Sequence, residues 1–240
     1  MLEVKFSAGP AVHGVLLLDT GRMRALTTLA PQSIAVTGRT HFKRKAAETV
    51  IERAFASAYG SSISCSYPTL MSVFGADNDV LATVGFRPAH IEPLFLEQYL
   101  QRPIDRVLSD ATGARVSRHE IVEIGSLASS GKGASIFLFV ALAAYLKQQG
   151  FTYAVVTATD ALRKTFDFLG FESVELADAD AAAVADGAAW GSYYAHRPKV
   201  LAGAIAAGVA RVERFLPPEH NRNLDQVFAA RRNPTESATV

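Results

Sequence analysis

HEIVEIGSLASSGKGASIFLFVALAAYLKQQG, residues 119–150, decides the fold. His119–Leu127 is rich in β-branched and apolar residues, which favours a buried strand. Ser135–Gln149 is apolar over about four turns and stops at Gly150, a typical helix terminator. The loop between the two contains too much glycine to extend the strand. The stretch therefore predicts a strand, a glycine loop and a helix in succession.

The residues that follow predict a second strand and a second helix. Phe151–Thr157 is short and apolar, as a buried strand is. Ala161–Leu169 comes next, with Asp160 placed to cap its start and Gly170 at its end. Two strands joined by a crossover helix run parallel. We therefore expect His119–Leu127 and Phe151–Thr157 to be the two central parallel strands of a sheet.

The flanking sequence adds antiparallel strands and further helices. Thr69–Phe74 and Val80–Arg87 are separated by a turn-rich run, Gly75–Asp79, which indicates an antiparallel pair. Such a pair beside a strand–helix–strand crossover gives an α+β fold, with a mixed twisted sheet flanked by helices. The remaining expected elements are a strand at Ser33–Thr37, helices at His41–Tyr59, Ile91–Leu100 and Val200–Leu216, and a polar connection at Gln101–Ser117.

The glycine loop, Ser129-Ser130-Gly131-Lys132-Gly133-Ala134, has the features of an anion site. A glycine loop that feeds a helix leaves backbone N–H groups unpaired, and the helix dipole adds partial positive charge there. Such an end binds a pyrophosphate, and Lys132 adds a mobile cation. The loop matches neither the P-loop nor the dinucleotide-binding fingerprint. The alternative is a helix start that needs glycine only for its geometry.

Together with Phe166–Phe171 (FDFLGF), the glycine loop resembles the core of the GNAT superfamily of N-acyltransferases. The resemblance implies that the loop cradles the pyrophosphate of acyl-coenzyme A or the phosphopantetheine of an acyl carrier protein. Two positions depart from the superfamily pattern: Ala128 stands where it has Gln or Arg, and Phe166 stands where it often has a proton-donating tyrosine. The residues that match the cofactor site are Leu127, Ala128, Ser129, Gly131, Lys132, Gly133 and Ala134.

A closer resemblance, to the thermostable haemolysin family, covers Arg53 to about Gly208. It rests on three segments, Phe95–Leu100 (FLEQYL), Glu123–Ser129 (EIGSLAS) and Trp190–Tyr194 (WGSYY). That family is itself similar to GNAT proteins and distantly similar to acyl-homoserine lactone synthases. The resemblance implies a GNAT-like fold, whereas the lytic phenotype in the family's name implies no particular chemistry.

Composition sets limits on the partners and the compartment. The chain has 240 residues, 49% of them hydrophobic, and a formal net charge of +1, which gives no nucleic-acid footprint. Cys65 is the single cysteine, which excludes an internal disulfide and indicates a reducing, cytoplasmic setting. The six histidines show no metal-ligand spacing. No secretion signal is apparent and no apolar helix reaches the ~20 residues that a bilayer needs, so we expect no integral membrane contact.

We expect the chain to have three parts. Residues 1–31 form an N-terminal extension, in which Val15–Leu18 is either an edge strand or a contact in a homodimer. Residues 32–216 form the GNAT-like acyltransferase domain. Residues 217–240 begin with two prolines and turn polar, which predicts a mobile tail.

Glu123 is the candidate catalytic residue. It lies within a predicted core strand, flanked by Val122 and Ile124. Burial raises the pKa of a carboxyl group toward the range of a general base, and the amine substrate of an acyltransferase has to lose a proton. The alternative is a structural carboxylate paired with Arg118 or Arg87.

Four residues are candidates for binding the substrate. Arg87 ends a predicted strand and suits a substrate carboxylate, and the alternative is a surface ion pair. Trp190 and Tyr193 lie in WGSYYAHRP, which either lines a pocket or anchors the C-terminal segment. Ser126 lies near the end of the central strand. In addition, the basic cluster at residues 39–45 is either a dock for an acidic carrier protein or a nucleotide phosphate, or a solvated face.

These residues and resemblances predict an N-acyltransferase that moves an acyl group from acyl-coenzyme A or an acyl carrier protein to a small-molecule amine. Glu123, or a water that it holds, takes the proton of the amine, and backbone N–H groups bind the thioester carbonyl and the pyrophosphate. Two alternatives stay open. One is a membrane-active, haemolysin-like protein without enzymatic activity. The other is a degenerate GNAT fold that binds an acyl thioester without turnover, which Ala128 and Phe166 favour.

Overall fold

The computed structural model describes residues 2–9, 12–131 and 133–216, so the predicted C-terminal tail and Lys132 lie outside the described residues. Its strands are β1 (Leu2–Ala8), β2 (Val12–Leu18), β3 (Ser33–Thr37), β4 (Thr69–Phe74), β5 (Val80–Pro88), β6 (Ile121–Ser129), β7 (Tyr153–Ala158), β8 (Val174–Asp178) and β9 (Lys199–Ala204). Its α-helices are α1 (Thr20–Arg24), α2 (Arg44–Tyr59), α3 (Ile104–Thr112), α4 (Ala134–Gln148), α5 (Asp160–Leu169) and α6 (Ile205–Val212).

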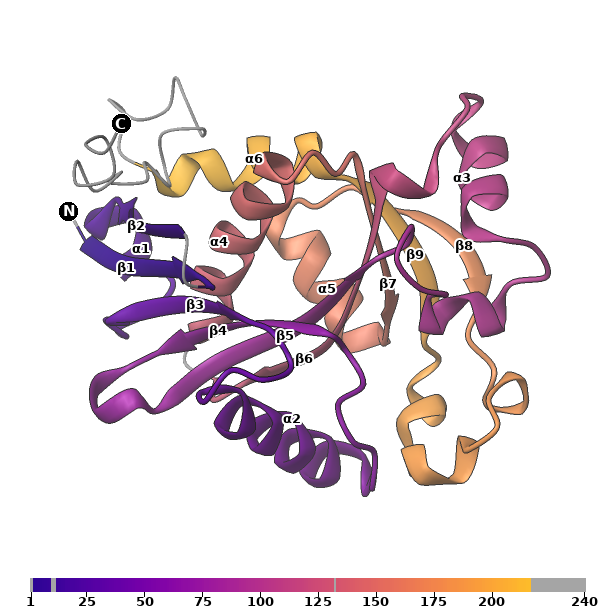
Figure 1. Cartoon of the computed structure of the whole chain (residues 1–240), viewed down its shortest axis with the longest axis horizontal. Helices are drawn as coiled ribbons and strands as arrows, with labels where there is room; N and C mark the ends of the chain where they lie inside the picture. The colour runs from indigo at the N-terminus through magenta and orange to yellow at the C-terminus, as the bar shows by residue number, and fades with distance from the viewer. Residues whose placement is uncertain (1, 10–11, 132, 217–240) are drawn as a thin grey trace, which may run out of the picture.

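These strands form one mixed sheet in the order β2-β1-β3-β4-β5-β6-β7-β9-β8 (Figure 1). The β6 and β7 strands pair in parallel, joined by α4, and β1 also runs parallel to β3. The other neighbouring strands are antiparallel. The predicted α+β fold, its mixed sheet and its central parallel pair are therefore confirmed.

Helices cover both faces of the sheet, and the alternation of side chains along each strand decides which residues meet them. On β4, Met71 and Val73 pack into the core that contains α4, while Leu70 packs under α2. On β6, Val122 belongs to the α4 core, while Ile121 packs against α3. Helices α4, α5 and α6 therefore lie on one face, and α2 and α3 lie on the other (Figure 1).

Helix α4 is the centre of the larger core. It is apolar almost all round because it lies between the sheet and α6, and most of its side chains are buried. Phe137 is fully buried, and truncating such a phenylalanine to alanine typically costs about 3–5 kcal/mol. The predicted helix over Ser135–Gln149 is confirmed to within one residue at each end. Its packing fixes the position of the glycine loop that precedes it.

The N-terminal residues lie within the sheet. Strands β1 and β2 form a hairpin, in which β1 pairs with β3 and β2 is the edge strand. The expected edge strand at Val15–Leu18 is the second part of β2, and Leu16 and Leu18 are fully buried. The segment that the sequence suggested as an extension therefore widens the core sheet by two strands.

The predicted helix over Val200–Leu216 is wrong. Lys199–Ala204 forms β9, between β7 and β8, and only Ile205–Val212 forms helix α6. A short run of small apolar residues does not distinguish a buried strand from a helix by its periodicity. Here the pairing with β7, which is distant in the sequence, decides in favour of the strand.

The predicted polar connection at Gln101–Ser117 is also wrong, because it contains helix α3. Ile104 and Leu108 lie one turn apart and pack against Ile121 of β6. Gly113 ends the helix with a φ of 69°, in the left-handed region that favours glycine. The sequence contains both the apolar pair, Ile104 and Leu108, and the terminating Gly113. The polar residues around them led to the prediction of a connection in place of a helix.

Two other predicted helices are shorter in the structure. The helix expected over His41–Tyr59 begins at Arg44, and the helix expected over Ile91–Leu100 is a 3-10 turn at Phe95–Tyr99. The β8 strand was not expected at all. Short segments give little periodicity to read, and Pro93 interrupts the run at Ile91–Leu100.

Candidate active site

The centre of the site is the point where β6 parts from β7. Parallel pairing between the two strands stops at Ile124 and Val156, but β6 continues to Ser129. The second half of β6 therefore has no strand on its β7 side among the described residues. A wedge between two splayed strands is a natural place for an extended ligand, because the backbone there has no partner strand.

A β-bulge accompanies the parting. Gly85 on β5 pairs with Gly125 on β6. Two residues earlier on β5, Thr83 pairs with Ala128, so β6 contains one extra residue in this interval. Ser126, within the bulge, has a φ of 50°, in the left-handed region. A bulge bends its strand and increases the local twist, which carries the second half of β6 away from β7.

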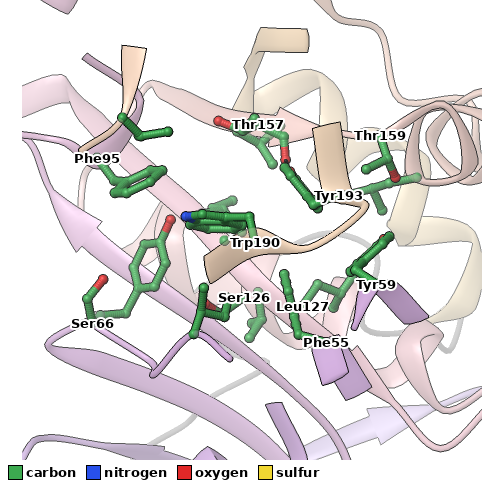
Figure 2. A pocket seen from close by; sticks show the side chains of 18 of the residues that line it. Phe55, Tyr59, Ser66, Phe95, Ser126, Leu127, Thr157, Thr159, Trp190 and Tyr193 are labelled. Atoms are coloured by element: carbon green, nitrogen blue, oxygen red, sulfur yellow. Dashed lines mark hydrogen bonds between the residues drawn. The ribbon is translucent and has the colours of Figure 1, made fainter. Parts of the chain in front are cut away.

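A cavity of about 640 Å³ lies in this wedge (Figure 2). Asp186 is the one charged residue among the described residues that line it. A wall that combines aromatic and apolar side chains with polar groups is typical of a small-molecule site. The aromatic side chains in the wall are Phe55, Tyr59, Tyr67, Phe95, Tyr99, Phe139, Phe166, Trp190 and Tyr193.

Trp190 and Tyr193, two of the predicted substrate-binding residues, lie together in this wall. The ring centroid of Trp190 is 5.3 Å from that of Phe95 and 5.1 Å from that of Tyr193. Tyr193 also meets Tyr59 of α2 edge-on at 5.2 Å, so the segment is anchored as well as exposed to the cavity. Ser126, a third predicted residue, lines the same cavity (Figure 2). The structure therefore brings these three predicted residues together.

A smaller apolar cavity of about 130 Å³ adjoins the large one. The two cavities share the lining residues Ile124, Phe139, Val156 and Phe166. The smaller one extends past Ala143 of α4 toward β9 and α6. Phe166, at the position where a tyrosine was expected, meets Phe139 edge-on at 6.1 Å and forms part of this apolar boundary.

The glycine loop follows the end of β6, and among its described residues none lines either cavity. Gly131 and Gly133 have φ values of 82° and 78°, which favour glycine. A Cβ on Gly133 would lie 2.6 Å from the carbonyl oxygen of Leu26, so packing against the segment after α1 also requires glycine there. A Cβ on Gly131 would meet open space. Gly133 is therefore explained by the alternative that this helix start needs glycine only for its geometry. At Gly131 the space where a side chain would point is open to a ligand.

The predicted cofactor-binding residues differ in their exposure. Ala128, at the Gln or Arg position of the superfamily, packs under α2 against Ala47 and Ile51 and is 3% exposed. A long polar side chain has no room there, which gives a packing reason for the departure. Among the others, Leu127 lines the large cavity, Ala134 is buried, Gly133 is partly buried, and Ser129 and Gly131 are exposed.

Glu123 lies behind the wall of the large cavity and is 1% exposed. Its Oε2 accepts the N–H of Phe95 at 2.9 Å, and its Oε1 accepts the N–H of Leu96 at 2.9 Å. The Nε of Arg87 lies 3.3 Å from Oε2, whereas Arg118, the other candidate partner, pairs elsewhere. Burial raises the pKa of Glu123, and the two N–H groups and Arg87 oppose that rise. The carboxylate therefore fixes the turn that carries Phe95 into the wall.

Arg87 is buried beside the cavity rather than in its wall. It is 8% exposed, which excludes the surface ion pair considered for it. Its Nη2 donates to Ser66 Oγ at 3.0 Å, and its guanidinium carbon lies 4.7 Å from the centre of the Tyr67 ring. Ser66 and Tyr67 both line the cavity, so Arg87 supports the wall from behind. Its predicted contact with a substrate stays a prediction.

Tyr67 was missed by the sequence reasoning. It lies just before β4 and lines the large cavity, with its ring over Gly85 and Gly125. A lone glycine inside a strand indicates that another group approaches the backbone closely. Strand β5 contains one such glycine, Gly85, and strand β6 contains another, Gly125. Burial raises the pKa of Tyr67, and likewise that of Tyr99 and Tyr193. These hydroxyls therefore stay neutral at physiological pH.

The basic cluster at residues 39–45 is only partly a solvated face. Arg44 is buried and donates to the backbone carbonyls of Tyr67 and Pro68. The Nζ of Lys43 lies 4.6 Å from the centre of the Phe74 ring. Residues such as Phe42, which is 83% exposed, form the outer part of the cluster. Docking of an acidic carrier protein on this outer part stays a prediction.

The described residues contain neither a cluster of metal-ligating side chains nor a membrane-spanning helix. In the ranges that the structure covers, no three His, Cys, Asp or Glu side chains come together in a group suited to a metal ion. In the same ranges, every helix falls short of the length and hydropathy that a membrane span requires.

The family model of thermostable hemolysin matches residues 37–209, which is more than half of the chain. The chain belongs to the thermostable hemolysin family. The bulged β6, the wedge and the aromatic segment at residues 190–193 all lie within the matched range. No curated protein sequence matches the chain significantly.

This member of the thermostable hemolysin family has the GNAT-like fold of several solved acyl synthases. It is similar to the AHL synthase LasI, with 17% identity, a TM-score of 0.53, and coverage of 77% of this chain and 95% of that one. The chain is also similar to TofI, solved with an inhibitor and MTA, with 16% identity, a TM-score of 0.51, and coverage of 78% of this chain and 98% of that one. FeeM, an N-acyl amino acid synthase from uncultured soil microbes, has 13% identity and a TM-score of 0.52, with coverage of 76% of this chain and 94% of that one. At these identities the similarity shows the fold alone.

Proposed function

We propose that this protein is an N-acyltransferase, which moves an acyl group from a pantetheine thioester to the amine of a small molecule. The donor is acyl-coenzyme A or an acyl carrier protein. The observation that carries the proposal is the wedge between β6 and β7, beside which lie two adjoining cavities of different character. Transfer between an extended donor and a separate acceptor needs two compartments that meet at one point. The fold shared with LasI and FeeM supports this proposal.

The donor fits along the second half of β6. Beyond Ile124 the strand has no partner on its β7 side within the described residues, so its backbone is available to an extended chain. Pantetheine is an extended chain with amide groups, and it would add to the sheet as a peptide does in strand addition. Its phosphate end would then reach Gly131 and the start of α4, where the helix dipole favours an anion.

The smaller cavity fits the acyl chain of the donor. Its wall consists mainly of apolar side chains, and it adjoins the large cavity where β6 and β7 part. Each buried CH₂ group contributes about 0.8 kcal/mol to binding. Donors with several carbons beyond the carbonyl are therefore expected to bind more tightly than an acetyl donor.

The aromatic part of the large cavity fits the acceptor. Asp186 supplies negative charge at an exposed position of the wall, and aromatic faces attract cations, so a protonated amine is favoured on entry. Glu123 is our candidate for the general base. It acts through a water, because its carboxylate lies behind Phe95 and Leu96. Its raised pKa moves it toward the range in which a carboxylate accepts a proton from an amine.

Mass spectrometry tests the proposal directly. Purified protein is incubated with thioesters of coenzyme A and of an acyl carrier protein, at graded acyl lengths, together with a mixture of small-molecule amines. We expect new amides and an equal amount of released thiol, and neither in a reaction without protein. Thioester binding without any amide would instead favour the degenerate, non-catalytic alternative. Dye release from lipid vesicles by the protein alone would favour the membrane-active alternative.

A further inference from the structure

Tyr67 lies across a pair of glycines at the bulge. Gly85 on β5 and Gly125 on β6 are direct partners in the antiparallel ladder. A Cβ on Gly85 would lie 2.5 Å from the Tyr67 ring, and a Cβ on Gly125 would overlap the Tyr67 hydroxyl. Both strands therefore need glycine at this level for the ring to lie flat on the sheet. The phenol reaches the residue immediately before Ser126, where β6 turns away from β7.

The ring of Tyr67 is held firmly, but its hydroxyl is not used by the fold. The guanidinium of Arg87 lies 4.7 Å from the ring centre, and Arg44 donates to the Tyr67 carbonyl oxygen. In the described part of the chain, the hydrogen bonds of Tyr67 involve its backbone and none involves its hydroxyl. Tyr67 also lines the large cavity. The hydroxyl is therefore available to donate a hydrogen bond to a ligand in the cavity.

We propose that the Tyr67 hydroxyl binds the carbonyl oxygen of the donor thioester and, with a backbone N–H of the bulge at Ser126, stabilises the negative charge that forms on that oxygen. This inference rests on the proposed acyl transfer. It assigns the polarisation of the carbonyl group to a tyrosine of the loop before β4. Helix α5 has Phe166, which has no hydroxyl, at the position where the superfamily often has a tyrosine. The hydroxyl lies beside the unpaired half of β6, where the extended donor is expected to run.

The reaction then balances without any further group. The amine nitrogen forms a bond to the carbonyl carbon, and the π electrons of the C=O bond move to the oxygen. The resulting oxyanion is held by the Tyr67 O–H and the backbone N–H. The C=O bond forms again as the C–S bond breaks and the thiolate leaves. The proton lost by nitrogen passes through a water to Glu123 and then to the thiolate, so that thioester and amine become amide and thiol.

The electrostatic surroundings suit a donor that keeps its proton. Burial and the charge of Glu123 raise the pKa of Tyr67, while Arg87 opposes them, and the net direction is strongly upward. A phenol of raised pKa is a poor proton source, but it remains a neutral O–H at any working pH. It therefore suits a hydrogen bond to an oxyanion better than proton transfer to the leaving group.

The variant Tyr67→Phe separates the hydroxyl from the ring. The ring still covers Gly85 and Gly125, so we expect an unchanged thermal unfolding temperature. The donor KM should rise only about fivefold, as expected for the loss of one neutral hydrogen bond. Loss of one oxyanion donor lowers kcat by about 100-fold or more. Tyr145→Phe is the matched control, because Tyr145 lies on α4 and packs against Phe6 and Phe86, away from both cavities. We expect that control to transfer at the wild-type rate.

Two further readouts respond to a hydrogen bond but not to packing. Fluorotyrosines at position 67 make the phenol more acidic at nearly constant shape, and the rate should change steadily with the acidity of the phenol. The infrared C=O stretch of a ¹³C-labelled acyl-coenzyme A, bound without an acceptor, should move to higher wavenumber in Tyr67→Phe than in the wild type. The fluorotyrosine series also decides the question if Tyr67→Phe folds poorly.

The outcomes distinguish this inference from the proposed function. If the wild type transfers and Tyr67→Phe transfers equally fast, the role of Tyr67 is overturned and the acyltransferase stands. The role of Tyr67 is likewise overturned if the rate does not depend on the acidity of the phenol, or if the C=O stretching frequency is the same in Tyr67→Phe and the wild type. If the wild type makes no amide from any donor, the proposed function fails and this inference falls with it.

Discussion

In its first half, Ile121–Ile124, β6 has a strand partner on each side, whereas in its second half, Gly125–Ser129, the described residues provide a partner only on the β5 side. The paired half buries a charged pair, Glu123 with Arg87, and both oxygens of the carboxylate accept backbone N–H groups. The unpaired half places Ser126 and Leu127 in the wall of the large cavity.

One extra residue at the bulge lies between the two halves, and a bulge bends its strand at the place where the pairing with β7 stops. The two halves also differ in where charged side chains lie relative to the cavity. Asp186 is the one charged side chain in the described lining of the large cavity, and the Glu123 carboxylate lies behind the wall. In the mechanism that we propose, a reaction in the unpaired half uses a proton acceptor, Glu123, that the paired half holds.

The variant Glu123→Gln tests this dependence and has the largest expected effect. We expect transfer to slow by about 100-fold near neutral pH, because the general base is lost, with recovery at high pH where the amine is already deprotonated. The amide NH₂ would also face a backbone N–H of Phe95 or Leu96, which destabilises the fold by about 1–3 kcal/mol. Steady-state rates and urea unfolding across about pH 6 to 9 measure the two effects.

The pH dependence of this stability difference has a defined sign. The folded pKa of Glu123 is raised, so the stability that the glutamate contributes is fully present below its unfolded pKa and falls as pH rises through the folded pKa. The deficit of Glu123→Gln should therefore shrink as pH rises through that window. Glu97→Gln is the matched control, since Glu97 also accepts backbone N–H groups and pairs with an arginine. Equal transfer by folded Glu123→Gln and the wild type at every pH would leave Glu123 a purely structural residue.

The variant Gly131→Val tests the far end of the unpaired half, with an intermediate effect. Gly131 has open space where a side chain would point, so a valine there would meet only the donor phosphates. We expect coenzyme A to bind about tenfold more weakly, equivalent to about 1.4 kcal/mol. Calorimetry measures this affinity. Gly113→Val is the control for backbone strain, because Gly113 also has a positive φ and open space. Unchanged affinity in folded Gly131→Val would remove the loop from the donor site.

The variant Ala143→Phe tests the smaller cavity and has the smallest expected effect. Ala143 lies on α4 and lines only this cavity, so a larger side chain shortens the space for an acyl chain. We expect kcat/KM for long-chain donors to fall several-fold, since each CH₂ that loses its site forfeits about 0.8 kcal/mol. Short-chain donors are the internal control and should react at the wild-type rate. A uniform loss at every chain length would show that the acyl chain lies elsewhere.

Much of the fold follows from local sequence. The strand at β6, the helix α4 and the strand at β7 were predicted because glycines bound periodic apolar runs. The helix predicted over Val200–Leu216 failed for the opposite reason, since its small apolar residues fit either a strand or a helix. Pairing with β7 decided that segment, and this pairing is a property of the assembled sheet.

Site residues were predictable where a single segment of sequence identifies them. They were missed where several segments, distant in the sequence, come together. Trp190, Tyr193 and Ser126 stand out by type or position, and the structure places all three at the cavity. The position of Tyr67 requires three segments to come together, because its ring lies on glycines of two strands that follow it in the chain. The burial of Glu123 was predictable from its apolar neighbours, but its two N–H donors come from a turn that the sequence suggested as a helix.

The adjoining apolar cavity has a consequence beyond the reaction itself. If an acyl chain fills it, the amide product carries a hydrocarbon tail on one side and the polar remainder of the amine on the other. Such a molecule is amphipathic, and amphipathic molecules partition into the membrane interface with their apolar part among the lipids. Lysis by such a product would need no membrane-spanning protein. It would survive heating, because a small amide has no fold to lose.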